Sequence, residues 1–203
     1  MDAKTCLKKL GYVGTLSFAT VDEAGNPQVR NVSAIHYEED SLYFYTAQGK
    51  NFCHELKTTK KVQILGLTMY KEMIRLSGEV IYLRDDDSIK WRDIIFEEQP
   101  YLENVYPGET KDIGAIFMIK DAEIEYFNLS VYPIFRESYT LGNGKITPKG
   151  FTITDSCIGC GKCERGCPQK AIHAGTPFVI QPEHCLHCGR CAVNCPVGAI
   201  RRL

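Results

Sequence analysis

The sequence lacks any apolar run of about 18 residues, the length that a membrane-spanning helix needs. Near Met1 it also lacks an apolar stretch followed by a small-residue cleavage site, so we expect no signal peptide. Net charge is nearly absent as well, at −1 over 203 residues. We therefore expect a cytoplasmic protein, with neither a membrane nor a nucleic acid as its partner.

Cysteine is scarce in the first part of the chain and dense in the last. Only Cys6 and Cys53 precede residue 157, and we expect both to be small buried hydrophobic residues. The other eight of the ten cysteines lie between Cys157 and Cys195. In a reducing cytoplasm such density indicates metal binding rather than disulfides.

The first part of the chain is predicted to be mainly β or α+β. β-branched and aromatic residues predict six strands, at residues 12–21, 28–37, 42–45, 62–67, 73–83 and 115–127. The first three are expected to form an antiparallel meander. Helices are predicted at 51–59 and from Asp85 to just before Pro100. Six short strands with few helices favour a small β-barrel or sandwich.

Glycine and proline mark the predicted domain boundary. Residues 141–150 contain Gly142, Gly144, Pro148 and Gly150, a composition typical of a flexible linker. We therefore expect a barrel over residues 1–140, a linker over 141–150 and a cysteine-rich domain over 151–203.

The cysteine-rich segment contains two copies of one motif, 28 residues apart. Each copy reads C-x2-C-x2-C-x3-C-P, with Gly161 or Gly189 directly after the second cysteine. This is the spacing of bacterial ferredoxins, in which the fourth cysteine of one loop binds the cluster of the other. Glycine lets the backbone pass close to the cluster.

The motif predicts two [4Fe–4S] clusters with exchanged ligands. We assign the first cluster to Cys157, Cys160, Cys163 and Cys195, and the second to Cys185, Cys188, Cys191 and Cys167. Structural zinc is the alternative, but zinc sites usually separate two C-x2–4-C pairs by a longer loop. Residues 151–203 resemble the two-[4Fe–4S] ferredoxin family, and Pro168 and Pro196 are expected to open short helices.

Histidines and basic residues accompany the cysteines. His184 and His187 are interpreted as solvent-facing loop residues, because eight thiolates already complete both sites. Residues 151–203 carry a net charge of +3, which leaves −4 on residues 1–150. A basic face favours docking of an acidic carrier such as a soluble ferredoxin or flavodoxin. Ordinary surface charge is the alternative interpretation.

Residues 11–84 resemble the flavin-binding split-barrel family that includes pyridoxamine 5′-phosphate oxidase. The resemblance rests on residues 14–20, 25–30, 42–46, 49–51 and 76–78, which follow the order and spacing of the family. It implies a barrel that binds flavin mononucleotide (FMN) between two subunits, and hence a homodimer.

The resemblance also implies the cofactor contacts. Carried over by position, they are Arg30, Asn31, Val32, Ser33, Tyr45, Thr46, Lys50 and Asn51. Arg30 is predicted to be a lone cation within a strand, to which a phosphate can bind bidentately. Lys50 and Asn51 begin a predicted helix whose free N–H groups favour the same phosphate. Taken singly, each charge is more often a solvated surface group.

One position departs from the family. The oxidases proper have a lysine five residues after the strand arginine, and this chain has Ile35 there. Their C-terminal substrate-binding segment is not recognisable either. We therefore do not expect vitamin B6 oxidation.

Together the two parts predict a flavin/iron–sulfur oxidoreductase. A flavin takes two electrons and can release them singly, whereas each cluster takes one. The clusters would relay electrons to or from an FMN that acts on a small substrate or a redox partner. The alternatives are a non-catalytic redox sensor or flavin-binding electron carrier, and a barrel that binds deazaflavin or haem instead.

Overall fold

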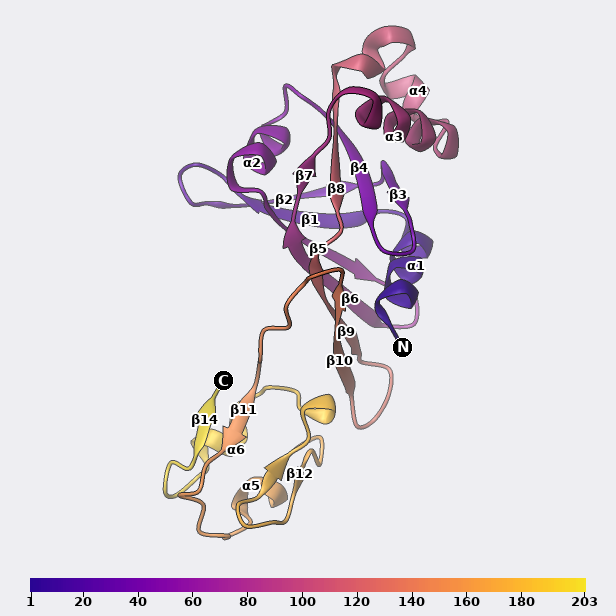
Figure 1. Ribbon diagram of the computed structural model, residues 1–203. Helices are drawn as coiled ribbons and strands as arrows, with labels where there is room; N and C mark the ends of the chain where they lie inside the picture. Colours follow the sequence, from indigo (N-terminus) through magenta and orange to yellow (C-terminus); the bar gives the residue numbers. More distant parts are fainter. The chain divides into compact units, whose positions relative to one another are not determined.

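The computed structural model describes residues 1–203, which divide into two compact units (Figure 1). The first unit comprises residues 1–68, 73–125 and 139–145. The second comprises residues 69–72, 126–138 and 146–203. The predicted domain boundaries at residues 140 and 150 stay a prediction. In the structure, residues 126–138 group with the cysteine-rich segment.

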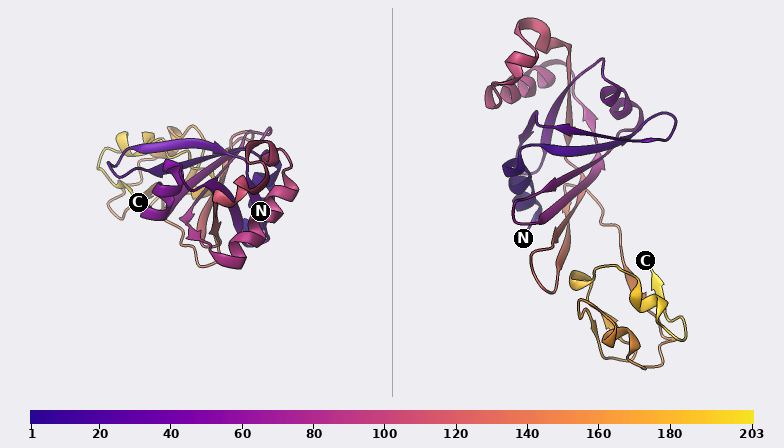
Figure 2. Two further views of the ribbon diagram at one scale, coloured as in Figure 1. Left: turned by 90° about the horizontal axis from the view of Figure 1, so that it is seen from above. Right: turned by 180° about the vertical axis from the view of Figure 1, so that it is seen from behind.

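The elements of the barrel and its hairpin are the following: α1 (Ala3–Val13), β1 (Leu16–Val21), β2 (Pro27–Val32), β3 (Ile35–Tyr37), β4 (Leu42–Ala47), α2 (Asn51–Thr59), β5 (Lys61–Leu67), β6 (Glu72–Glu79), β7 (Ile81–Tyr82), α3 (Asp85–Glu98), α4 (Leu102–Val105), the 3₁₀ helix η1 (Gly108–Ile113), β8 (Gly114–Ile119), β9 (Ala122–Asn128) and β10 (Phe135–Leu141). Figures 1 and 2 show α2 and the α3–α4 segment on different sides of the barrel.

The strands form two sheets, as the predicted barrel requires. One sheet has the order β10-β9-β6-β5-β1-β2 and the other β3-β4-β8-β7. The two antiparallel pairings of the expected meander are present, as β1 with β2 and β3 with β4, but the single strand predicted over 28–37 is wrong, because β2 and β3 belong to different sheets. The Ile35 backbone N–H donates to the Ser33 carbonyl over 2.8 Å. This tight three-residue turn redirects the chain from one sheet to the other.

A cluster of aromatic rings fills the barrel. Phe18 lies edge-on to Phe44 with ring centroids 5.0 Å apart, and Phe44 stacks on Phe117 at 5.6 Å. All three side chains are fully buried. Strand β5 alternates buried and exposed residues along its length, as expected where one face of a sheet packs on a core.

Two predicted helices are confirmed, whereas α1 and α4 were not predicted. α2 matches the predicted residues 51–59, and α3 begins at Asp85 and ends before Pro100. The predicted strand at 12–21 is wrong in its first residues, because α1 extends to Val13. The Asp2 side chain caps α1 by accepting a hydrogen bond from the Thr5 backbone N–H over 2.7 Å. The single strand predicted over 115–127 is two strands, β8 and β9, and β10 was not predicted.

Helix α3 covers the outer face of β4, so β4 is buried on both faces. Tyr43 and Tyr45 pack with Ile95 and Phe96 in one buried cluster. His36 on β3 pairs with Glu98 at 2.9 Å. Burial opposes charge on His36, but hydrogen bonds to Glu38 and Glu98 outweigh it and raise the pKa of this imidazole. These contacts fix α3 beside β3 and β4.

The cysteine-rich segment is built as two similar halves. Its elements are β11 (Phe151–Ile153), α5 (Lys162–Arg165), β12 (Ile172–His173), β13 (Val179–Ile180), η2 (Pro182–His184), α6 (Arg190–Val193) and β14 (Ile200–Arg202). β11 pairs with β14 and β12 with β13, both antiparallel. The short helices contain the third cysteine of each motif and end before the fourth. The expectation that Pro168 and Pro196 open these helices is therefore wrong.

Among all the helices of the protein, none has the length and apolar character that a membrane span requires.

Candidate functional site

A cavity of about 480 Å³ lies among β2, β4, the start of α2 and the α4 region. All eight predicted FMN contacts line it: Arg30, Asn31, Val32, Ser33, Tyr45, Thr46, Lys50 and Asn51. The sequence did not predict the other lining residues, which include Phe52, Glu55, Tyr101, Leu102, Val105 and Tyr106. The structure therefore gathers the predicted residues at one place, and their contact with FMN stays a prediction.

The start of α2 gives the cavity its anion-binding character. Lys50 precedes the first helical residue, and Lys50, Asn51 and Phe52 all face the cavity. The first N–H groups of a helix lack partners within the helix and carry a partial positive charge. The Lys50 ammonium donates to the Tyr106 hydroxyl over 3.0 Å, so this cation is held at the cavity wall.

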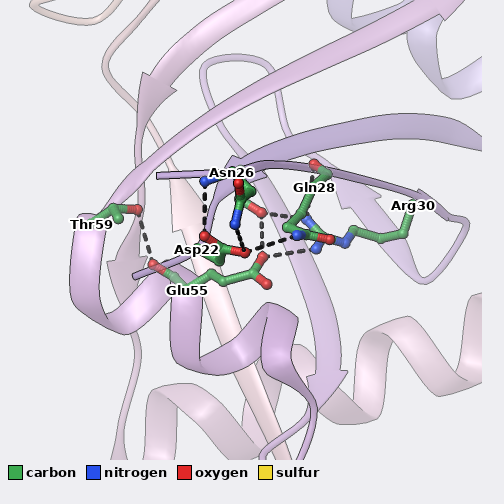
Figure 3. Close-up of polar contacts among 7 residues, drawn as sticks. Asp22, Asn26, Gln28, Arg30, Glu55 and Thr59 are labelled. Carbon is green, nitrogen blue, oxygen red and sulfur yellow. Dashed lines mark hydrogen bonds and ion pairs between the residues drawn. The ribbon is translucent and has the colours of Figure 1, made fainter. Parts of the chain in front are cut away.

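Arg30 is not the lone cation that the sequence predicted. It pairs with Glu55 of α2, with Nη2 2.7 Å from Oε2 (Figure 3). Arg30 also donates to the Thr20 hydroxyl. Thr20 in turn donates to Glu55, whose side chain is only 5% exposed. Arg30 is paired because the buried Glu55 carboxylate must have a partner of opposite charge and hydrogen bonds. Phe52, Glu55 and Leu56 share the buried face of α2. The helical spacing of Glu55 from these two apolar residues is the sequence pattern that indicates a buried acid.

Tyrosines complete the wall near α4. Burial raises the pKa of Tyr45 to about 12, and its hydroxyl donates to the Lys111 carbonyl over 3.0 Å. The Tyr45 hydroxyl is thus already hydrogen-bonded within the protein, and the Tyr45 ring forms part of the cavity wall. The Ser33 and Tyr101 hydroxyls lie 2.6 Å apart and join β2 to the α4 segment.

This donor set fits a flavin phosphate. Because Arg30 and Glu55 neutralise each other, the net positive charge comes from Lys50 and the start of α2. Thr46 and Asn31 add hydrogen-bonding groups at the same wall. The aromatic rings of Phe52 and Tyr106 suit a planar ring system. The volume lies within the range of small-molecule sites.

Two further cavities lie in the cysteine-rich segment, and each is lined by four cysteines. One has Cys157, Cys160, Cys163 and Cys195, and the other has Cys167, Cys185, Cys188 and Cys191. These are the two predicted sets, including the exchanged fourth cysteines. No group of three or more Cys, His, Asp or Glu side chains is gathered tightly enough for a single metal ion. A [4Fe–4S] cube is larger than one ion, so its thiolates stand further apart.

Backbone geometry supports thiolate ligands in both sets. Gly161 and Gly189 have φ values of 69° and 76°, a conformation that glycine adopts without strain. The Ala171 N–H donates to Cys167 Sγ, and the Ala199 N–H to Cys195 Sγ, both over 3.3 Å. Backbone N–H groups, that of Val197 first, lower the pKa of Cys195 and favour the metal-binding thiolate. Burial raises the pKa of Cys185.

The two isolated cysteines lie where they were predicted, and the two histidines beside the clusters do not. Cys6 and Cys53 are fully buried, as expected. His184 and His187 do not face solvent as predicted, since both are half-buried and contact the hairpin of β9 and β10. His184 Nδ1 lies 3.0 Å from the Ile134 carbonyl oxygen, and His187 contacts Arg136. The sequence could not reveal these contacts, because they join segments about 50 residues apart.

Two family models match the chain. Residues 4–103 match pyridoxamine 5′-phosphate oxidase, and residues 156–199 match the 4Fe-4S dicluster domain. A pyridoxine/pyridoxamine 5′-phosphate oxidase of Pectobacterium atrosepticum is 37% identical over 62 residues, which are 30% of this chain and 27% of the oxidase. The Escherichia fergusonii oxidase is 35% identical over 63 residues, or 31% and 29%. The match thus spans less than a third of the length of these curated relatives.

Solved structures share the barrel fold. A NimC/NimA family protein of Clostridium acetobutylicum is similar with a TM-score of 0.57 and 27% identity, covering 68% of this chain and 92% of that one. A pyridoxamine 5′-phosphate oxidase-related, FMN-binding protein of Nostoc punctiforme gives 0.51 and 17%, covering 71% and 93%. A heme binding protein of Mycobacterium smegmatis gives 0.55 and 10%, covering 69% and 58%. The predicted split barrel, dicluster domain and cofactor types are confirmed by the family matches.

Proposed function

Because residues 4–103 belong to the pyridoxamine 5′-phosphate oxidase family and residues 156–199 are a 4Fe–4S dicluster domain, we propose that the protein is a flavin/iron–sulfur oxidoreductase. The observation that carries the proposal is the presence, in one chain, of a cavity suited to FMN and two four-cysteine cavities. FMN exchanges two electrons with a substrate and single electrons with clusters. The clusters therefore serve as an electron inlet or outlet for the flavin.

The substrate is proposed to differ from that of the vitamin B6 oxidases. Ile35 is buried and stands where those oxidases have a lysine, so no cation lies at that position. The match to those oxidases also covers less than a third of their length. A small oxidised molecule or a second redox protein is the proposed electron acceptor or donor.

The experiment is a reoxidation assay on protein purified without oxygen. The visible spectrum must first show flavin peaks above the broad cluster absorbance. The protein is then reduced with dithionite, freed of excess reductant and mixed with a panel of small acceptors. Rapid reoxidation by one class of compound supports an enzyme. Reoxidation by none of them, with both cofactors present, would contradict catalysis and favour the sensor or carrier. Haem or deazaflavin absorbance in place of flavin would contradict the proposal that the barrel binds FMN.

Replacing Lys50 with glutamine is expected to weaken FMN binding about ten- to hundredfold. A charged hydrogen bond to a phosphate contributes roughly 1.5–3 kcal/mol, and Lys50 carries the net positive charge of the cavity. The measurement is the dissociation constant of FMN by fluorescence titration, with iron content as a check on the clusters. The matched control is Lys57→Gln on the same helix, because Lys57 lies over the Tyr82 ring and does not line this cavity. An unchanged dissociation constant for the Lys50 variant would show that the phosphate binds elsewhere.

The proposed protein partner is an acidic electron carrier. All six basic residues of the C-terminal segment are exposed: Lys162, Arg165, Lys170, Arg190, Arg201 and Arg202. Exposed charges of one sign accelerate association with a partner of opposite sign, and salt screens them. We expect the rate of cluster reduction by an acidic ferredoxin to fall several-fold as NaCl rises from 50 to 500 mM, roughly a change of Debye length from above 10 Å to below 5 Å. A rate that does not depend on salt would exclude this mode of docking.

The proposal has two further features, the oligomeric state and the location. The split-barrel resemblance implies a homodimer that holds FMN between subunits, and the molecular mass in solution tests it. The cytoplasm is the proposed location, since [4Fe–4S] clusters need reduced thiols for assembly.

A further inference from the structure

The tip of the β9–β10 hairpin (residues 126–138, hereafter the hairpin tip) contacts residues beside the second set of cysteines. The Tyr132 hydroxyl donates to the Pro168 carbonyl over 3.1 Å, and the Ile134 N–H donates to Gln169 Oε1 over 2.9 Å. His184 Nδ1 bonds the Ile134 carbonyl oxygen at 3.0 Å. Each contacted residue is next to, or two positions from, Cys167 or Cys185.

The internal repeat makes these contacts specific to one half. The residues that meet the hairpin tip with their side chains are Gln169, His184 and His187. Their counterparts 28 residues away in the other copy are Val197, Ser156 and Gly159. Valine and glycine cannot make the corresponding polar side-chain contacts. The sequence repeat is therefore broken at the positions where the structure places the hairpin tip.

Arg136 is the charged residue of the hairpin tip at this contact. It donates from Nη1 to the His187 ring, with Nη1 2.9 Å from Nε2, and its guanidinium lies 4.5 Å from the centre of the Phe127 ring. The side chain is half-buried, and its Nε atom is fully buried. His187 lies between the ligand candidates Cys185 and Cys188 in sequence. A permanent positive charge is thus held against the loop that carries the second set.

Arg136 lies close to two cysteines of the second set, because the His187 ring that it contacts is two residues from Cys185 and adjacent to Cys188 in sequence. Near the first set the comparable residue is Arg165, which donates to the Cys160 carbonyl over 3.1 Å. Arg165 is exposed, so water and salt weaken its field. The half-buried Arg136 acts through a medium of lower dielectric constant.

We propose that Arg136 raises the reduction potential of the second cluster above that of the first. A single electron in the dicluster domain then resides mainly on the second cluster. Reduction adds one negative charge to a cluster, and a nearby fixed cation stabilises the reduced form. The inference rests on the proposed function in one respect only, which is that both cysteine sets bind [4Fe–4S] clusters. It assigns to the hairpin tip the role of making two otherwise similar clusters unequal.

The test is a potentiometric titration of the full-length holoprotein, followed by electron paramagnetic resonance. Arg136→Gln and Arg136→Met remove the charge with different side-chain shapes, and Arg136→Lys keeps it. Arg165→Gln is the matched control near the first set. Cys160→Ser and Cys188→Ser identify which one-electron couple belongs to the first and which to the second cluster.

We expect both neutral variants to shift the distribution of the electron between the clusters by about tenfold toward the first, which is 59 mV for a one-electron couple. Arg136→Lys should stay near the wild type, and Arg165→Gln should shift the distribution less than threefold. Unchanged couples in the neutral variants, or an equal shift in Arg165→Gln, would overturn the inference. So would loss of iron from both neutral variants, because Arg136 would then be needed for structure rather than for potential. A wild-type protein without two cluster couples would instead contradict the proposed function.

Discussion

Replacing Arg30 with methionine is expected to destabilise the barrel by about 3–5 kcal/mol, the usual cost of leaving one member of a buried ion pair alone. The partner left behind is Glu55, whose side chain is only 5% exposed. Thr20 still donates one hydrogen bond to this carboxylate, but it carries no charge. Arg30 itself is 23% exposed, so the opposite change, Glu55→Gln, should cost less.

The measurement is urea unfolding followed by tryptophan fluorescence. Trp91 is the single tryptophan of the chain and stacks on Tyr43 with ring centroids 3.8 Å apart. Both residues belong to the first unit, so the signal reports on the barrel and not on the clusters. The midpoint should move to lower urea with an unchanged slope, since the surface exposed on unfolding stays nearly the same.

A double variant separates the pair from its surroundings. In Arg30→Met with Glu55→Leu neither charge remains, and buried ion pairs replaced by apolar residues of similar size often lose no stability. We expect the double variant to be more stable than Arg30→Met alone by at least about 2 kcal/mol. Additive effects of the two single changes would contradict the coupling of Arg30 to Glu55. This result also bears on flavin binding, because FMN loss from an Arg30 variant could reflect a damaged barrel, whereas Lys50 has no buried partner carboxylate.

The sequence was sufficient where short-range patterns determine structure. The spacing of eight cysteines predicted two sets of four, and Asn51–Thr59 was predicted as a helix with the correct ends. The order of five short segments was enough to predict a split barrel. The size of a cluster and the pattern of one helix are constraints that act within a few residues, whereas the barrel was predicted from the family resemblance of those segments.

The sequence was insufficient where partners come from distant segments. Arg30 and Glu55 are 25 residues apart, and only the folded barrel brings β2 beside α2. Tyr106 and Lys50 are separated by 56 residues, and α4 was not predicted at all. His184 and His187 were expected to face solvent because eight thiolates already complete both cluster sites, and the hairpin that contacts them was not predicted. In each case the residue type was informative, but its partner depended on how the sheets are connected.

Replacing Cys195 with alanine is expected to remove the first cluster, although Cys195 belongs to the second copy of the motif. The reason is geometric, because Cys195 lines the same cavity as Cys157, Cys160 and Cys163. A cluster with three thiolates and one open position is readily lost, so iron should fall from about eight to about four per chain. Iron alone would not reveal which cluster is missing.

Alkylation followed by mass spectrometry identifies the missing cluster, since a thiolate bound to iron is protected from iodoacetamide. In Cys195→Ala the reactive cysteines should be those at 157, 160 and 163, while the second set stays protected. The matched variant Cys167→Ala should give the reverse pattern, because Cys167 shares its cavity with Cys185, Cys188 and Cys191. Cys6 and Cys53 are fully buried in the barrel and serve as unreactive references in both variants. Labelling at 185, 188 and 191 in Cys195→Ala would mean that each motif binds its cluster with its own four cysteines, and the exchanged assignment would be wrong.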